Sequence, residues 1–191
     1  MPFLAMSRCQ DLAAARRRFL GTSGVALSAA AVAMLAGRSS LARGATGSAA
    51  DVGILNAALG SELEAIAAYQ VGAQSGLLKK PALDLAVTFQ GHHRAHADLL
   101  DKTVRTLGGN PVATKASYAF PVETLKTEED VLRFAAGLER AAVSAYLGAV
   151  PAFGDRGLAK AAASILGDEA MHWAVLRQAV GDVPVPGPFV A

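Results

Sequence analysis

Apolar residues recur every three or four positions in four long segments of the chain, which is the spacing of one face of an α-helix. Start signals such as the capping pattern at residues 127–130, and stop signals such as Gly108 and Pro151, bound these segments. The four predicted helices cover about residues 51–75, 81–107, 127–150 and 155–180. No segment carries the alternation typical of a half-buried strand, so the sequence predicts an all-α fold.

The lengths of the connections predict how these helices are arranged. Residues 110–126 contain two prolines and no sustained period, and they form a long connection between helices 2 and 3. The other two connections are short, which places consecutive helices antiparallel and side by side. We therefore expect an antiparallel four-helix bundle with one long crossover between helices 2 and 3. The bundle occupies residues 51–182, and a Pro-rich tail follows at 183–191.

Each predicted helix carries ionisable residues in its apolar stripe, where leucine or alanine would be expected. The six residues are Glu62, His93, His96, Glu139, Glu169 and His172. Glu62 and His93 both lie about 18–20 Å from the turn of the first hairpin, at 1.5 Å per residue. The two glutamates of the second hairpin lie at a similar level. Because a bare buried carboxylate is costly, these groups are expected to be paired, protonated or bound to a metal.

The two predicted hairpins look like copies of one another. In each of them a glutamate is followed seven residues later by a tyrosine: Glu62/Tyr69 and Glu139/Tyr146. The two glutamates are 77 residues apart, and the segment 93–96 aligns with 169–172 at an offset of 76. Two independent pairings with nearly the same offset indicate a duplicated hairpin.

The spacing within helix 4 points to metal chemistry. Residues at positions i and i+3 share one face of a helix, so Glu169 and His172 reach the same point in the interior. One Glu from each of two helices, with a Glu-x-x-His from each of the other two, is the ligand set of carboxylate-bridged di-iron and di-manganese bundles. Oxygen and imidazole ligands suit Fe, Mn or Zn. On these residues, the chain from about 51 to 181 resembles the ferritin-like superfamily, in particular exported ferritin-like proteins with rubrerythrin-type helices.

The resemblance implies a di-iron centre, with Mn or Zn as the other candidate metals. The ligands that it implies are Glu62, His96, Glu139, Glu169 and His172, with Tyr69 and Tyr146 beside them. In helix 2, however, His93 stands where the family pattern has a glutamate, and an imidazole brings no negative charge. The site is an asymmetric dinuclear centre, a single-metal site or a remnant, and His93 is a ligand or a bystander. Its neighbour His92 is the alternative residue to turn inward.

Residues 1–42 differ in character from the rest of the chain. An arginine triplet at residues 16–18 precedes Phe19 and Leu20, an apolar run over residues 21–36 and small residues at 40–42. This order resembles a twin-arginine export signal, and an ordinary secretory signal with a chance arginine cluster is the alternative. The signal predicts a periplasmic or otherwise exported protein with the export machinery as a partner.

Two outcomes are expected for this signal. Cleavage after Ala42 or Ala45 would leave a linker that extends to residue 50. An uncleaved signal would act as an N-terminal membrane anchor.

Composition excludes several functional classes. The chain has 191 residues, enough for one domain, with 18 Lys+Arg against 16 Asp+Glu. The arginines of residues 1–42 account for the basic excess, and the remainder has a net charge of −2, which argues against nucleic-acid binding. The single cysteine, Cys9, excludes an internal disulfide and a cysteine-rich zinc site.

Three functions stay open at this point. The first is an exported metalloprotein that oxidises Fe(II) or reacts with O₂ or peroxide. The second is a non-catalytic bundle that binds metal for storage, buffering or stress protection, which the histidine at position 93 favours. The third is a scaffold whose polar layer fixes the register of the helices. The pattern leaves open whether the protein is an enzyme and whether it forms a homo-oligomer.

Overall fold

The computed structural model describes residues 49–190 of the chain. The predicted signal peptide at 1–42, both expected cleavage positions and most of the linker lie outside the described residues. Their assignment therefore stays a prediction from the sequence.

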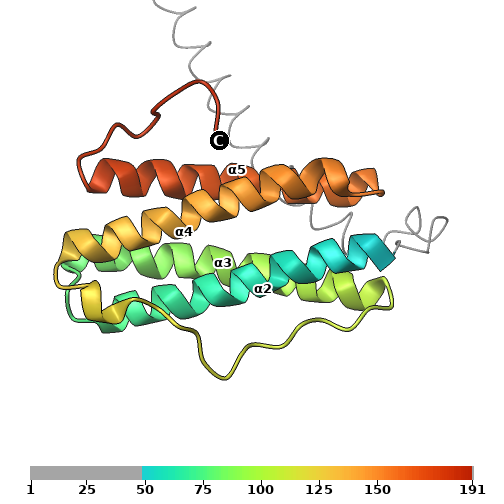
Figure 1. The fold of residues 1–191 in the computed structure, drawn as a ribbon, viewed down its shortest axis with the longest axis horizontal. Coiled ribbons are helices and arrows are strands. Elements are labelled where there is room, and N and C mark those ends of the chain that lie inside the picture. Colours follow the sequence, from blue (N-terminus) through green and yellow to red (C-terminus); the bar gives the residue numbers. More distant parts are fainter. Residues whose placement is uncertain (1–48, 191) are drawn as a thin grey trace, which may run out of the picture.

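The described part of the chain is an antiparallel four-helix bundle, as predicted (Figure 1). Its helices are α2 (Ala49–Gln74), α3 (Lys80–Thr106), α4 (Glu128–Ala149) and α5 (Arg156–Ala179), with two short 3₁₀ turns, η2 (Val122–Thr124) and η3 (Val150–Ala152). No strand occurs within residues 49–190. Helices α2 and α3 form one antiparallel hairpin, and α4 and α5 form the other.

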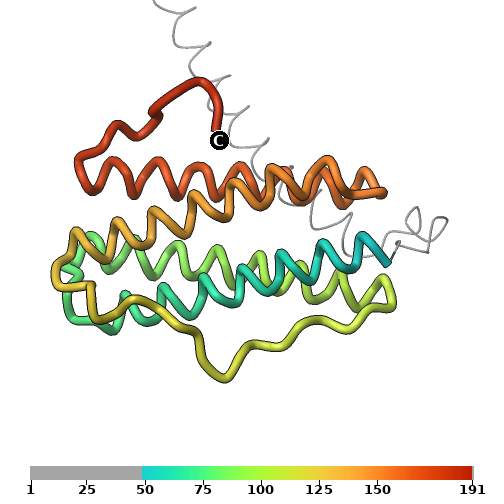
Figure 2. Tube along the Cα trace, viewed as in Figure 1, coloured from blue at the N-terminus to red at the C-terminus, as the bar shows by residue number. Residues whose placement is uncertain are grey.

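The connection between the hairpins runs along the whole length of the bundle, from the end of α3 to the start of α4 (Figure 2). For this reason α4 runs in the same direction as α3 and antiparallel to α2. None of the helices within residues 49–190 is long and apolar enough to cross a membrane.

The helix boundaries follow local sequence signals. Thr127 and Asp130 form the predicted capping box of α4, and the Asp155 side chain accepts hydrogen bonds from two backbone N–H groups at the start of α5. Gly108 and Gly181 have positive φ angles of 78° just beyond α3 and α5, a conformation that favours glycine. The buried Asp51 accepts a hydrogen bond of 2.8 Å from the Gly154 backbone N–H, which ties α2 to the turn between α4 and α5.

The apolar core is divided into two ends with a polar layer between them. At one end, the N-terminal half of α2 packs against the C-terminal half of α3 through Leu55, Leu59, Leu100 and Val104. At the other end, the buried residues include Tyr69, Phe89, Leu132 and Leu176. The six ionisable residues of the apolar stripes lie between these two clusters, at the same level in all four helices.

Candidate metal centre

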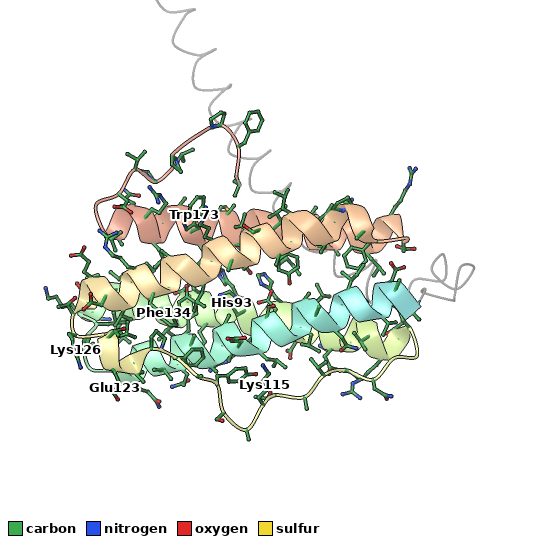
Figure 3. The ribbon with its side chains drawn as sticks, viewed as in Figure 1. His93, Lys115, Glu123, Lys126, Phe134 and Trp173 are labelled. Carbon is green, nitrogen blue, oxygen red and sulfur yellow. The ribbon has the colours of Figure 1, made fainter. Side chains whose placement is uncertain are left out.

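The bundle brings all six predicted site residues together in one cluster. Helix α2 supplies Glu62, α3 supplies His93 and His96, α4 supplies Glu139, and α5 supplies Glu169 and His172. His96 is partly buried, whereas each of the other five is at most 3% exposed. Figure 3 shows His93 near the middle of the bundle. The level of each residue along its helix, predicted from residue counts alone, is therefore confirmed.

His93 lies between the glutamates of the other two helices. Its Nδ1 is 2.8 Å from Glu62 Oε2, and its Nε2 is 3.2 Å from Glu139 Oε1. His93 is thus the residue of the adjacent pair that turns into the core, while the side chain of His92 is 45% exposed. A doubly protonated His93 ring can donate to both glutamates at once.

Glu169 occupies the corresponding position between two histidines. Its Oε1 is 3.1 Å from His96 Nδ1, and its Oε2 is 3.6 Å from His172 Nδ1. One oxygen of this carboxylate therefore faces each histidine.

The cluster contains two overlapping sets of potential ligands. Within each set, the four ligand atoms lie within 4.8 Å of one another. One set is Glu62, His93, His96 and Glu169, and the other is His93, Glu139, Glu169 and His172. His93 and Glu169 belong to both. This sharing follows from the duplicated hairpin, because positions 93 and 169 are equivalent in the two copies.

Several buried atoms of the cluster have no hydrogen-bond partner within the described residues. They are His96 Nδ1, His172 Nδ1, Glu139 Oε2 and both carboxylate oxygens of Glu169. Buried polar atoms are normally hydrogen-bonded, so such a group requires an explanation. All five belong to residues of the two ligand sets, and metal ions bound by these sets would satisfy them. The oxygen and imidazole donors fit Fe, Mn or Zn.

Each of the two outer glutamates, Glu62 and Glu139, accepts a hydrogen bond from a tyrosine of the opposite hairpin. The Tyr69 hydroxyl of α2 donates to Glu139 on α4, and the Tyr146 hydroxyl of α4 donates to Glu62 Oε1 on α2 at 2.6 Å. Burial and the adjacent carboxylates raise the pKa of both phenols, so the hydroxyls remain donors. The expected place of both tyrosines beside the cluster is thus observed, and each fixes the orientation of one carboxylate.

Sequence reasoning missed Asp168. Its Oδ2 lies 3.4 Å from His96 Nε2 and 3.3 Å from His172 Nε2, on the outer side of both rings. A carboxylate in this position fixes which ring nitrogen carries the proton and leaves Nδ1 free to face the interior. The spacing held a signal that was not used, because a residue four positions before His172 lies on the same face of α5.

His92 extends the cluster toward solvent. Its Nδ1 is 2.8 Å from His172 Nε2 and 3.3 Å from Asp168 Oδ2, so His92, Asp168 and His172 form a third, partly exposed group of potential ligands. The Phe89 ring stacks on His172 with centroids 3.9 Å apart and limits its rotation. His93 is thus the histidine that turns inward, and His92 contacts the cluster from its exposed side.

We expect Asp168→Asn to weaken metal binding about 10- to 100-fold, because loss of an outer carboxylate typically costs that much affinity. Competition titration against a chelator of known affinity measures the change. Asp84→Asn is the matched control, because Asp84 pairs with Lys80 on the exposed surface. Equal affinities for the two variants would contradict a positioning role for Asp168.

The metal-free cluster is a network of ion pairs. Burial alone would lower the pKa of its three inner histidines, but the surrounding carboxylates outweigh it and raise the pKa to about 9 for His93 and about 11 for His96 and His172. Burial would raise the pKa of Glu139, yet contact with His172 and His93 holds it well below its usual range. Burial raises the pKa of Glu169, so this carboxyl group accepts a proton most readily.

The raised pKa of His93 predicts how the stability of the metal-free protein depends on pH. Its ion pairs contribute fully below the unfolded pKa of 6.5 and are lost as the pH rises through about 9. We therefore expect the contribution of His93 to the free energy of unfolding to fall by on the order of 3 kcal/mol across this window, in addition to the contributions of His96 and His172.

Urea unfolding in the presence of a chelator, from about pH 6 to about pH 10, measures this loss. His93→Gln is the control, since it removes one of three titrating rings and should make the fall shallower, while His96 and His172 still contribute to it. An equally steep fall in both proteins would assign the effect to another group.

Comparison with known proteins places these observations in context. The sequence model of a family described as ferritin-like domain matches residues 50–182. Among solved structures, the fold is similar to that of a conserved hypothetical protein from Mycobacterium tuberculosis, with a TM-score of 0.64 and 21% sequence identity. That match covers 74% of this chain and 97% of the other. No curated protein matches the sequence.

Proposed function

The chain belongs to the ferritin-like domain family, and on this premise we propose that it is an exported metalloprotein with a carboxylate-bridged pair of metal ions, iron in the first place and manganese as the alternative. The activity that we assign to this centre is oxidation of Fe(II) or reaction with O₂ or peroxide. The observation that carries the proposal is the set of five buried nitrogen and oxygen atoms without hydrogen-bond partners, all of which belong to residues of the two overlapping ligand sets.

The duplicated hairpin suggests how the residues divide between two cations. Glu62 and His96 would hold one, and Glu139 and His172 would hold the other, with Glu169 between them. The two tyrosines orient the outer glutamates. His93 lies between the outer glutamates, with Nδ1 2.8 Å from Glu62 and Nε2 3.2 Å from Glu139, and its neutral ring can offer one of these nitrogens to a cation.

Asp168 offsets the carboxylate that is missing at position 93. Two divalent cations bring four positive charges, and the cluster holds four carboxylates: Glu62, Glu139, Asp168 and Glu169. When the histidines are neutral, as metal ligation requires, the charges balance. The fourth negative charge thus lies in the outer layer, where it acts through His96 and His172.

Bound iron would supply one-electron chemistry with O₂ or peroxide, and the protein's own residues decide when the ions bind. In the metal-free state, protons on His93, His96 and His172 compensate the carboxylates. These protons must leave before the nitrogens can act as ligands, so metals and protons compete for one cluster.

A non-catalytic metal-binding role is the second candidate, and His93 is the observation that favours it. In its present position the ring closes the gap between Glu62 and Glu139 and forms an ion pair with each. A cluster that is satisfied in this way without metal is suited to reversible binding. Retention of bound Fe(II) without faster oxidation than in buffer would favour this role over the redox one.

The proposal is tested by counting metal ions in the protein as it is exported. The full chain is expressed with its own N-terminus, purified from the periplasm and analysed by elemental mass spectrometry, before and after anaerobic loading with Fe(II). We expect about two ions of Fe or Mn per chain. About one ion would indicate a single-metal site, and no ion after loading would overturn the metalloprotein proposal. The location of the purified chain also tests the export signal.

A further inference from the structure

The seam between α2 and α4 is open on one side of the cluster and closed on the other. On the open side, a groove of about 620 Å³ runs between the N-terminal half of α2 and the C-terminal half of α4. On the closed side, the same two helices leave a space of only about 20 Å³. The two sides are equivalent halves of a duplicated hairpin, so this difference is specific to the residues that line them.

Side-chain size explains the difference. Positions that are 77 residues apart carry small residues in the groove and large ones in the closed half. The pairs are Ala57/Phe134 and Gly148/Val71, and Ser61 of the groove corresponds to Leu138, which lines both halves. A Cβ added at Gly148 would meet no atom within 4 Å, so the space there is empty of protein.

The crossover contributes to the lining of the closed half but not to that of the groove. Leu125 from the crossover lines the small space there, and the Phe120 ring contacts Phe134 with centroids 6.0 Å apart. Figure 3 places Phe134 toward the end of the bundle where α4 begins. As a consequence, Ala68 is buried in the closed half, whereas its equivalent in the groove, Ala145, is exposed.

The floor of the groove is the cluster itself. Glu62, His93 and Glu139 line its inner end, together with the Tyr146 ring, and its walls are mainly alanines of the two helices. The opposite side of the cluster is polar and partly exposed, with His92 and Asp168. The cluster is therefore approached by a polar side, which suits ions, and by an apolar groove, which does not.

We propose that the groove binds an elongated, uncharged organic molecule with an alkyl chain, whose end lies against Glu62, His93 and Glu139. This inference rests on the proposed metal centre and specifies the class of ligand that reaches it. The volume falls in the range of small-molecule sites, about 300–1,000 Å³. The walls are mainly alanines, with Ser61 and Glu64 as their polar side chains, which suits an alkyl chain. The carboxylates of Glu62, Glu64 and Glu139 disfavour an anionic end. A helix of a second copy is the alternative occupant, and its diameter of about 10–12 Å is much larger than that of an alkyl chain.

The test measures displacement of the fluorescent dye Nile red by a series of linear alcohols, from hexanol to dodecanol, in metal-loaded protein. We expect affinity to rise roughly three- to fourfold with each added methylene, the gain for burial of one CH₂ group. In protein kept metal-free with a chelator, decanoic acid should bind at least tenfold more weakly than decanol at neutral pH, since no metal ion then compensates the carboxylates of the floor. Alcohols that fail to displace the dye, or affinities independent of chain length, would overturn the proposal.

The chain itself provides the blocking variant. Ala57→Phe with Ser61→Leu places in the groove the side chains that already fill the equivalent half. We expect it to lose alcohol binding at least tenfold while its metal content stays unchanged. Ala163→Phe with Ser164→Leu is the matched control, because it makes the same changes on the exposed face of α5. Equal alcohol affinity in both variants would contradict the assignment of the groove.

These measurements separate the groove from the metal centre. Two metal ions per chain without alcohol binding would overturn the groove proposal alone. Alcohol binding that is lost in the blocking variant, in a protein that takes up no metal, would support the groove and overturn the proposed function. Analytical ultracentrifugation tests whether a second copy occupies the groove instead. If the wild type is a dimer that binds no alcohol, and the blocking variant is a monomer, the groove is a contact between copies.

Discussion

A chain with Glu139→Ala and Glu169→Ala is expected to retain less than a tenth of the metal of the wild type. The two glutamates supply three of the five unpartnered atoms, and Glu169 is the carboxylate that faces both His96 and His172. Removing one partner of a buried charged contact costs about 2–5 kcal/mol, so the loss of two corresponds to at least roughly a thousandfold in affinity. Elemental analysis after anaerobic Fe(II) loading measures this directly.

Two further double variants test whether metal is lost because the ligands are missing or because the protein is misfolded or less acidic. Glu139→Gln with Glu169→Gln keeps the size of both side chains, so the bundle should fold while metal binding is still lost. Glu123→Ala with Glu129→Ala removes two exposed carboxylates and should leave the metal content unchanged. A scaffold whose polar layer only fixes helix register predicts a different pattern, namely loss of stability in the core variants with no metal in any protein.

Replacing His93 by glutamate is expected to change metal-free and metal-bound stability in opposite directions. Without metal, the substitution removes the cation that pairs with Glu62 and Glu139 and adds a fourth buried carboxylate. Breaking a buried ion pair in this way costs about 3–5 kcal/mol. Urea unfolding in the presence of a chelator measures this loss.

With metal, the same substitution restores a negative charge between the two cation positions. At an effective dielectric constant of 20, a unit charge about 4 Å from another is worth about 4 kcal/mol, so we expect the second ion to bind at least about tenfold more tightly. Competition with a chelator measures this gain. His93→Gln is the matched control, because it has the size of glutamate without the charge. If the two variants bind the second ion equally well, charge at position 93 does not limit the site.

Local signals in the sequence were sufficient for the fold. Helix periodicity, the capping box at Thr127 and the prolines of the crossover depend only on neighbours along the chain, and they gave the four helices to within about two residues. The polar cluster could also be predicted, because a residue's level in a hairpin follows from counting residues to the turn. The duplication strengthened this inference, since it assigned equivalent roles to Glu62 and Glu139.

Some features of the site depend on the tertiary structure and cannot be obtained by counting residues along the chain. Successive residues of a helix point about 100° apart, so the choice between His92 and His93 depended on how α3 is rotated against its neighbours. Asp168 became part of the cluster because histidines from two different helices face it. The groove depends on which large side chains are absent along a seam between helices that are distant in sequence. Periodicity and spacing are properties of single segments and determined the elements and the residue types, whereas orientation and empty space arise between segments and were decided only by their packing.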